Sequence, residues 1–229
     1  LGDGFRFSTH WGGWSAIDSL QRITFIPHVL AGQIFLVLFI MTFSDKSLKW
    51  GIMGLIAGII FPPVLIVIYS IFILMMVLER KIDISKILFI IISLPALLYL
   101  QVMFKILPWS ALALFDIQHR SILPYAEYAL ALGPVLPLGI AGLILALVKK
   151  ERKFFPFVSW ILTLGLLFII FEHVPQQSPT RFTQMLITLP LGILSTYFFY
   201  SLWHIYDKYK RSHAFVIRIG LGSIMTIII

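Results

Sequence analysis

The chain contains no cysteine and very few charged residues. Among 229 residues there are 10 Asp and Glu and 18 Lys and Arg, so charged side chains make up only 12%. The absence of cysteine excludes disulfides, thiolate metal sites and thiol catalysis within this sequence. A soluble domain has about a quarter charged residues, so the scarcity of charge excludes an ordinary soluble domain.

Apolar residues take the place of the missing charge. The sequence is 59% hydrophobic with a mean hydropathy of +0.97. A helix needs about 20 apolar residues to cross a bilayer, and open strands are excluded from lipid. We therefore expect an all-α fold, a polytopic transmembrane helical bundle. The expected spans are 24–43, 50–78, 87–104, 129–148, 154–171, 183–203 and 214–229.

The two ends of the sequence indicate a piece of a longer chain. The first residue is Leu1 rather than Met, and the last residues, GSIMTIII, lie within an apolar run. We expect residues 1–229 to form a single transmembrane domain that is a fragment. Motifs that are missing here would then lie upstream.

The run at 50–78 is too long for one simple span. As a straight helix it would extend roughly 43 Å, and Pro62-Pro63 would break its middle. Residues 50–61 alone would extend only about 18 Å, which is too short to cross. We expect a broken element, re-entrant or hairpin-shaped, that reverses at the prolines. Gly51, Gly54 and Gly58 in its first half permit close helix approach.

Basic residues are concentrated in four short breaks: DKSLK (45–49), ERKIDISK (79–86), KKERK (149–153) and DKYKR (207–211). These breaks hold twelve Lys and Arg, against five in the other breaks. The positive-inside rule places the basic breaks in the cytoplasm. If 50–78 crosses once instead of reversing, the count is still twelve Lys and Arg on one side against five on the other. Short loops such as DKSLK follow the positive-inside rule most closely, and only a reversal places DKSLK on the basic side.

The remaining breaks are then expected on the outer face of the membrane. They are the first 23 residues, the stretch from Lys105 to about Leu132, and residues 172–181. The net charge of +8 is confined to short loops, so no nucleic-acid partner is expected. Tryptophans near span ends, among them Trp50, Trp109 and Trp160, fit interfacial belts.

The string EHVPQQSPTRF (172–182) is the densest polar segment. Arg181 begins the next span and has the planar fork that binds phosphate oxygens. Glu172 and His173 are candidates for proton transfer, although adjacent residues do not share a helix face. Gln176 and Gln177 offer hydrogen bonds to a sugar. The alternatives for Arg181 are a lipid headgroup contact and a salt bridge to Glu172.

A second candidate region is the entry to the first span. Arg22 stands just before the apolar run, and His28 lies inside it, directly after Pro27. A histidine in the first turns of a span suits a polar cavity, where it binds a phosphate or carries a proton. The alternative is a packing role, in which His28 hydrogen-bonds a neighbouring helix.

The third region is the long outer break, where WSALALF (109–115) is expected to lie along the interface. Asp116, His119 and Arg120 follow it, and the first two are three residues apart. A zinc site needs three or four ligands, so no resident metal is expected. The hypothesis that a divalent cation bridges Asp116 to an upstream carboxylate stays open. The sequence has no phosphate loop, nucleophile elbow or dinucleotide fingerprint, so no cofactor is expected.

Three passages resemble the GT-C superfamily of membrane glycosyltransferases, in particular its prokaryotic polytopic members. They are GIMGLIAGIIFPP (51–63), AEYALALGPVLPLGIAGLILAL (126–147) and SPTRFTQMLITLPLGIL (178–194). The resemblance implies a multi-pass hexosyltransferase that takes its sugar from a polyprenyl-phosphate donor on the outer face. The acidic outer loop that supplies the family's catalytic base is not visible. Asp18 is the one early acidic candidate, and the base is expected upstream of Leu1.

Carried onto this sequence, the resemblance implies a donor site on the outer face. Arg181, with Arg22, would hold the donor phosphate, and the other candidates would line the cavity: His28, His119, Arg120, Glu172, His173, Gln176 and Gln177. The competing hypothesis is a transporter or flippase for a lipid or small anion, with 50–78 as a mobile gate. Transporters often contain an inverted repeat, and none is visible here, which favours the enzyme.

Overall fold

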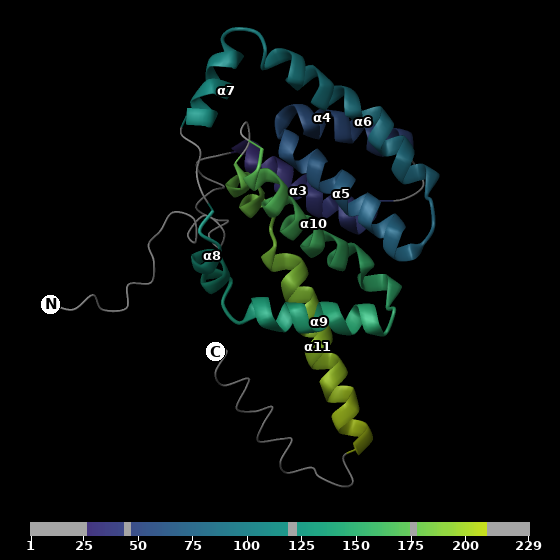
Figure 1. Ribbon diagram of the computed structural model, residues 1–229. Coiled ribbons are helices and arrows are strands. Elements are labelled where there is room, and N and C mark those ends of the chain that lie inside the picture. Colours follow the sequence, from purple (N-terminus) through teal and green to yellow (C-terminus); the bar gives the residue numbers. More distant parts are fainter. Residues whose placement is uncertain (1–26, 44–46, 119–122, 175–177, 210–229) are drawn as a thin grey trace, which may run out of the picture.

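The computed structural model describes residues 27–43, 47–118, 123–174 and 178–209, and all regular elements among them are helices (Figure 1). This confirms the all-α prediction. The α-helices are α3 (Pro27–Thr42), α4 (Ser47–Ile60), α5 (Pro62–Glu79), α6 (Ile84–Met103), α7 (Trp109–Gln118), α8 (Tyr125–Leu132), α9 (Val135–Val148), α10 (Phe155–Glu172) and α11 (Thr188–Tyr209). Two 3-10 helices, η1 (Arg152–Phe154) and η2 (Pro179–Gln184), precede α10 and α11.

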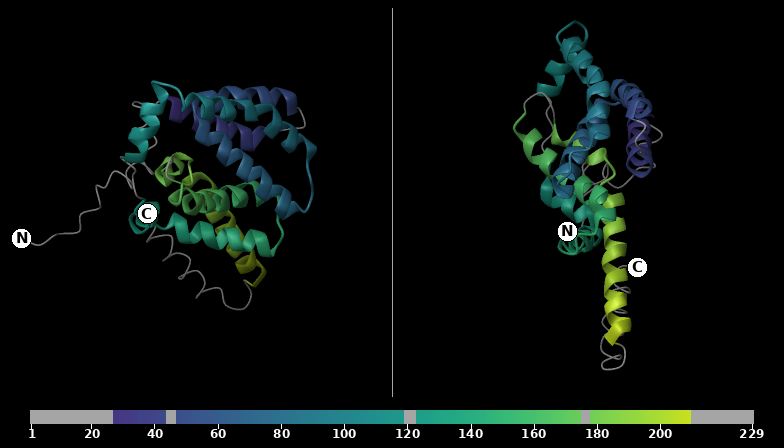
Figure 2. Two further views of the ribbon diagram at one scale, coloured as in Figure 1. Left: turned by 45° about the horizontal axis from the view of Figure 1, so that its top comes forward. Right: turned by 90° about the vertical axis from the view of Figure 1, so that its right-hand side faces the viewer.

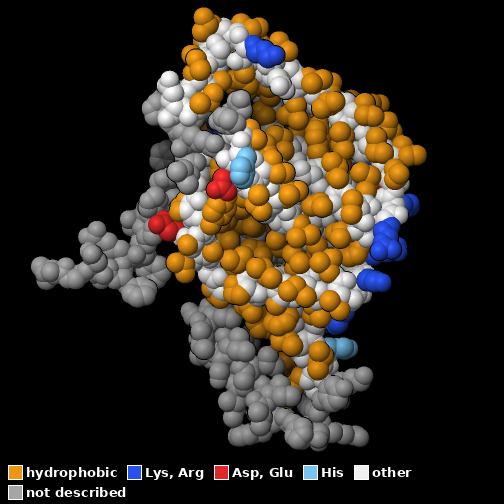
Figure 3. Space-filling model, viewed as in Figure 1, with side chains coloured by type: hydrophobic (Ala, Val, Ile, Leu, Met, Phe, Trp, Pro, Cys, Tyr) orange, Lys and Arg blue, Asp and Glu red, His pale blue; other side chains and the backbone are white. Residues whose placement is uncertain are grey.

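Three helical segments in the described residues are long and apolar enough to cross a membrane. They are α5, α6 and the continuous segment Arg152–Glu172, and α8 with α9 makes a fourth if the bent pair is one span. Large apolar side chains such as Ile73, Ile91 and Ile169 are exposed on their outer faces. Hydrophobic surface dominates the view in Figure 3. Such surface suits lipid rather than water, so length and composition are those of a membrane protein.

The chain reverses direction between α4 and α5. Phe39 of α3 contacts Trp50 and Phe72, and its ring centroid lies 5.3 Å from each. These two residues stand eleven positions before and after Phe61. Pro62 and Pro63 occupy the first turn of α5, where a missing N–H costs no helical hydrogen bond. The broken element predicted at 50–78 is therefore confirmed, in its hairpin form.

The glycines of α4 allow it to pack closely against α6. A Cβ atom added at Gly51 would lie 2.6 Å from Cγ2 of Ile92, and one added at Gly54 would lie 2.6 Å from Cε2 of Phe89. Both distances are shorter than real contacts, so only glycine permits this approach. These residues serve helix packing, as the sequence indicated.

Two of the expected spans differ from single straight helices. The segment 129–148 consists of the end of α8 and α9, which meet at an angle of 84°. Gly133 has a φ of +58° and Pro134 follows it, so the helix cannot continue through them. The described part of 24–43 is α3, with 16 residues, which at about 1.5 Å per residue is too short to cross alone.

The expected span 183–203 also begins differently. Residues up to Gln184 belong to η2, Leu186 has a φ of +50°, and α11 starts only at Thr188. Helix α11 is 22 residues long but contains four Tyr, two Ser, a Trp, a His and two charged residues, and it is not among the helices apolar enough to span. It crosses α9 and extends beyond it (Figures 1 and 2). The expected span 214–229 lies outside the described residues.

Basic side chains gather at one end of the helices. Arg80 and Lys81 follow α5, while Lys149 and Lys150 follow α9. In Figure 3 most of the visible Lys and Arg side chains line the right-hand edge, where α5 and α9 end, with one histidine below them; another basic side chain lies at the top, and two acidic groups and a second histidine lie toward the left. The basic loops that follow α5 and α9 therefore lie at the same end of the fold, as expected from the sequence.

Labelling can test which end faces the cytoplasm. Because the chain lacks cysteine, single cysteines at Glu151 and Ser178 would be the sole thiols. We expect an impermeant maleimide to label position 178 in intact cells and position 151 only after permeabilisation, because the positive-inside rule predicts a cytoplasmic basic end. Labelling of 151 but not 178 in intact cells would reverse the assignment.

A buried lysine joins α5 to α6 at the basic end. Lys86 is 6% exposed, and its Nζ donates to Oδ2 of Asp83 at 2.9 Å and lies 3.7 Å from Oε2 of Glu79. Asp83 also accepts from the backbone N–H of Ser85 and so caps α6. Burial on its own raises the pKa of Asp83. The hydrogen bond and positive charge of Lys86, with the backbone N–H groups, outweigh burial and hold that pKa below its usual value.

This lowered pKa predicts a loss of stability in acid. The carboxylate of Asp83 stabilises the fold fully at pH values above its usual pKa of about 3.9. This contribution to stability is lost as the pH falls below that value toward the lowered pKa of the folded protein. Asp83→Asn keeps a side-chain acceptor for Ser85 but has no charge. At pH 7 we expect it to be less stable than the parent by up to about 1 kcal/mol. The gap in thermal unfolding temperature between the two proteins should narrow from pH 5 to pH 3, and a constant gap would contradict this assignment.

Candidate functional site

Segments that are far apart in the sequence meet at the end opposite the basic loops. The His28 ring of α3 lies 5.7 Å from the ring of Phe61, at the turn between α4 and α5. Tyr125, which begins α8, donates its hydroxyl to Oε2 of Glu172, at the end of α10, at 2.8 Å. The start of α3 therefore contacts the α4–α5 turn, and the start of α8 contacts the end of α10.

The 3-10 helix η2 is the irregular segment built into this region. Its N-cap Ser178 accepts from the backbone N–H of Thr180, and Pro179 takes the first position, where no N–H is needed. Thr183 Oγ1 donates to the carbonyl of Thr180 at 2.7 Å. Phe182 is buried, and its ring lies 4.7 Å from that of Phe171. These contacts fix η2 against the end of α10.

Two long-range hydrogen bonds satisfy the backbone between η2 and α11. Gln33 Nε2 of α3 donates to the carbonyl of Gln184 at 2.7 Å, and the indole Nε1 of Trp160 donates to the carbonyl of Met185 at 3.0 Å. Non-helical backbone at membrane depth needs partners from the protein, because lipid supplies none. Trp160 was expected at an interface, but it is 0% exposed and serves this role.

Arg181 lies on η2 between two buried residues, Thr180 and Phe182, and is itself half-buried. Its backbone is therefore fixed, while part of its side chain remains accessible. Arg181 precedes Phe182 in the sequence, and Glu172 follows Phe171. Because the rings of Phe171 and Phe182 are in contact, Arg181 and Glu172 lie on adjoining segments. The structure thus brings the Arg181 and Glu172 segments into one region.

Glu172 and His173 use different hydrogen-bonding partners. Glu172 accepts from Tyr125, whereas Nδ1 of His173 lies 3.0 Å from the carbonyl of Ile169 in its own helix. Both side chains are exposed. Tyr125 was missed by sequence reasoning, because only the fold shows that α8 begins beside the end of α10.

The other predicted site residues divide into two groups. His28 is exposed in the first turn of α3, and Gln33, five residues later, connects the same helix to η2. The remainder lie outside the described residues: Arg22, His119, Arg120, Gln176 and Gln177. Within the described parts of the chain, no group of three His, Asp or Glu side chains is placed to hold a metal ion.

The described region offers a guanidinium, a carboxylate oriented by a phenol, and imidazoles, at one end of apolar helices. This combination suits the headgroup of an anionic amphiphile. Comparison of the chain with protein-family models, with curated proteins and with solved structures yields no match.

Proposed function

We propose that this protein is a membrane-embedded glycosyltransferase of the prokaryotic plasma membrane. It would bind a polyprenyl-phosphate sugar at the end opposite the basic loops, on the extracytoplasmic face. The observation that carries the proposal is the placement of Arg181 on a buried, hydrogen-bonded 3-10 segment beside the end of α10. The GT-C-like passages in the sequence support the reaction class.

The fixed backbone of η2 gives Arg181 an advantage in binding phosphate. A side chain on a rigid segment loses less conformational entropy on binding than one on a mobile loop. Its planar fork can donate two parallel hydrogen bonds to phosphate oxygens. The apolar surface beside it would receive the lipid chain of the same molecule.

Transfer of the sugar forms a bond between its anomeric carbon and the oxygen of the acceptor hydroxyl and breaks the bond to the phosphate oxygen. Polyprenyl phosphate leaves with the electron pair of that bond, and a base must take the proton of the acceptor hydroxyl. Glu172, which accepts from Tyr125 at 2.8 Å, is the oriented carboxylate beside the donor site and would hydrogen-bond the sugar with His173.

A transporter or flippase is the second candidate, and the two interrupted helix pairs favour it. The chain reverses between α4 and α5, and α8 meets α9 at 84°. Discontinuous helices that surround a binding site are typical of secondary transporters. In that case the same polar end would be one mouth of the pathway.

The full chain in lipid nanodiscs distinguishes the two candidates. Binding of a polyprenyl phosphate is compared with binding of the corresponding alcohol, and a polyprenyl-phosphate sugar with a labelled sugar is then supplied with acceptor glycolipids. We expect the phosphate to bind at least about tenfold more tightly, because a charge-assisted contact is lost with the alcohol. We also expect the label to leave the donor. In liposomes, movement of the donor across the bilayer without loss of its sugar would favour the flippase. Equal binding of phosphate and alcohol would contradict both candidates.

A further inference from the structure

Two basic loops at one end of the bundle are built in the same way. We call them the α5 loop (residues 80–83) and the α9 loop (residues 149–153). Arg80 and Lys150 end their helices with φ values of +52° and +53°, a conformation that glycine usually takes at this position. The N–H of each donates to the carbonyl three residues earlier, at 3.2 and 3.1 Å. Hydrogen bonds therefore fix the backbone of both loops, and a cation occupies the same position in each.

The two loops lie over the same part of the core. Leu78, near the end of α5, and Phe154, directly after the α9 loop, both pack against one buried cluster that includes Ala146 and Leu194. In Figure 3 most of the visible basic side chains gather along the edge where α5 and α9 end. The cations of the two loops are therefore neighbours.

The carboxylates near these loops are held by other lysines. Glu79 lies 3.7 Å from Nζ of Lys86, and Glu151 lies 3.8 Å from Nζ of Lys153. Within the described residues no carboxylate forms an ion pair with the other cations of the two loops, which are all exposed: Arg80, Lys81, Lys149, Lys150 and Arg152.

The ends of the two helices offset only a small part of this charge. A helix C-terminus carries about half an elementary negative charge, so α5 and α9 together supply about one. Four of the five positive charges then remain uncompensated, and an anion held between the loops would relieve their mutual repulsion.

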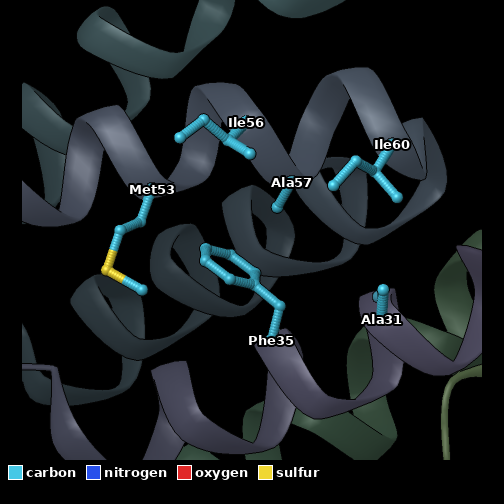
Figure 4. A pocket seen from close by; sticks show the side chains of 7 residues that line it. Ala31, Phe35, Met53, Ile56, Ala57 and Ile60 are labelled. Carbon is cyan, nitrogen blue, oxygen red and sulfur yellow. The ribbon is translucent and has the colours of Figure 1, made fainter.

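Exposed apolar side chains beside the cations favour an anion that carries hydrocarbon chains. Ile82 directly follows Lys81 and is 76% exposed, and Val148 directly precedes Lys149 and is 73% exposed. Such side chains are unfavourable in water and favourable among acyl chains. The pocket between α3 and α4 differs, because it has apolar walls alone (Figure 4) and no group that selects a charged headgroup. Charge and apolar surface occur together at the loops.

We propose that the α5 loop and the α9 loop together bind the headgroup phosphate of one anionic phospholipid. Arg80 and Arg152 donate to its oxygens through their planar forks, the lysines add positive charge, and the adjacent apolar side chains contact the acyl chains. A zwitterionic phospholipid carries its own cation, which these side chains repel, so the loops distinguish headgroups by charge. The site lies at the end opposite the proposed donor site and uses none of its residues, so it does not depend on the proposed function.

Native mass spectrometry of the full chain in a nonionic detergent tests the headgroup preference. The protein is titrated separately with dioleoyl phosphatidylglycerol, with dioleoyl phosphatidylcholine, and with glycerol 3-phosphate, which has the phosphate but no acyl chain. We expect one phosphatidylglycerol per chain to bind at least about tenfold more tightly than phosphatidylcholine, because several cations contribute. Glycerol 3-phosphate should not bind at the same concentrations. Equal binding of the two lipids overturns the proposal, and equal binding of glycerol 3-phosphate and phosphatidylglycerol shows a soluble-anion site instead.

Single substitutions test whether both loops form one site. Lys81→Gln and Lys149→Gln each remove a charge at an exposed position without a positive φ, so the backbone of the loops should not change. Each should weaken phosphatidylglycerol binding about fivefold, the effect of one Lys or Arg at an anionic membrane surface. Lys105→Gln, the same change at an exposed lysine beyond the other end of α6, is the matched control and should bind like the parent. An effect from one loop alone contradicts a shared site, and an equal effect of Lys105→Gln means that the lipid responds only to the overall charge.

Discussion

Arg181→Ala should weaken binding of polyprenyl phosphate by roughly ten- to over a hundredfold and leave the amount of inserted protein unchanged. One charge-assisted hydrogen-bonded contact is worth about 1.5–3 kcal/mol, which corresponds to this range of affinity. The residue is half-buried, and Ser178, Thr180, Phe182 and Thr183 supply contacts that hold η2 in either variant. Titration of each variant in nanodiscs with a prenyl phosphate measures the effect.

The lysine variant shows whether geometry matters as well as charge. A lysine ammonium is a point charge and cannot reproduce a two-pronged contact, so Arg181→Lys should also lose most of the affinity. Arg152→Ala, an exposed arginine at the basic end, is the matched control and should bind like the parent. If Arg181→Lys binds the prenyl phosphate with full affinity, Arg181 is a structural or membrane-surface residue. The same conclusion follows if Arg181→Ala lowers the protein level without a change in affinity.

Local rules were sufficient for the features that depend on a few neighbouring residues. The hairpin between α4 and α5 follows from Pro62-Pro63, because proline cannot continue a helix from the preceding turn. The close packing of α4 on α6 follows from the spacing of Gly51, Gly54 and Gly58. The segregation of basic residues at one end follows from their positions in the breaks. All three are visible in the sequence before any tertiary contact is known.

The bend between α8 and α9 shows a weaker local signal that hydropathy concealed. Gly133-Pro134 stands inside an apolar run of the length expected for a span, so the run was interpreted as continuous. The positive φ of Gly133 needs a residue without a Cβ, and Pro134 has no N–H to continue the helix. A glycine followed by proline is a sufficient reason to divide such a run.

The contacts that build the candidate site depend on tertiary structure instead. Gln33 and Gln184 are 151 positions apart in the sequence, and Tyr125 and Glu172 are 47 apart. Each residue has an acceptable alternative partner in lipid headgroups or in its own helix. Only the packed arrangement of α3, α8, α10 and η2 selects these pairs, which is why the sequence predicted the region but neither Gln33 nor Tyr125 in its role.

The same change, glycine to alanine, should have opposite effects on stability at two positions of the α9–α11 pair. Gly142 of α9 faces the backbone of α11: an added Cβ would overlap the carbonyl oxygen of Leu194 and lie 2.6 Å from its carbonyl carbon. Backbone atoms cannot rotate away as a flexible side chain can. Gly142→Ala should therefore force the two helices apart and destabilise the protein by about 1–3 kcal/mol.

Gly192 of α11 is the matched control, because a Cβ added there has no atom within 4 Å. Alanine is favoured over glycine in a helix by up to about 1 kcal/mol, so Gly192→Ala should be neutral or stabilising. Gly165 of α10 has equally open surroundings and should behave in the same way. The apparent melting temperatures in detergent are compared at one heating rate. For a chain of this size about 1 kcal/mol corresponds to a shift of about 2–4 °C.

The loss at Gly142 should also extend along the whole contact between the two helices. Gly139, one turn earlier, faces Leu191, and Leu143 and Ala146 pack in one cluster with Leu194 and Tyr197. A displacement of α9 therefore removes contacts from several buried side chains at once. The double variant Gly139→Ala/Gly142→Ala should lose less stability than the sum of the two single variants, because both changes act by separating the same two helices. Strict additivity, or a Gly142→Ala protein as stable as Gly192→Ala, would show that α9 and α11 do not approach each other through these glycines.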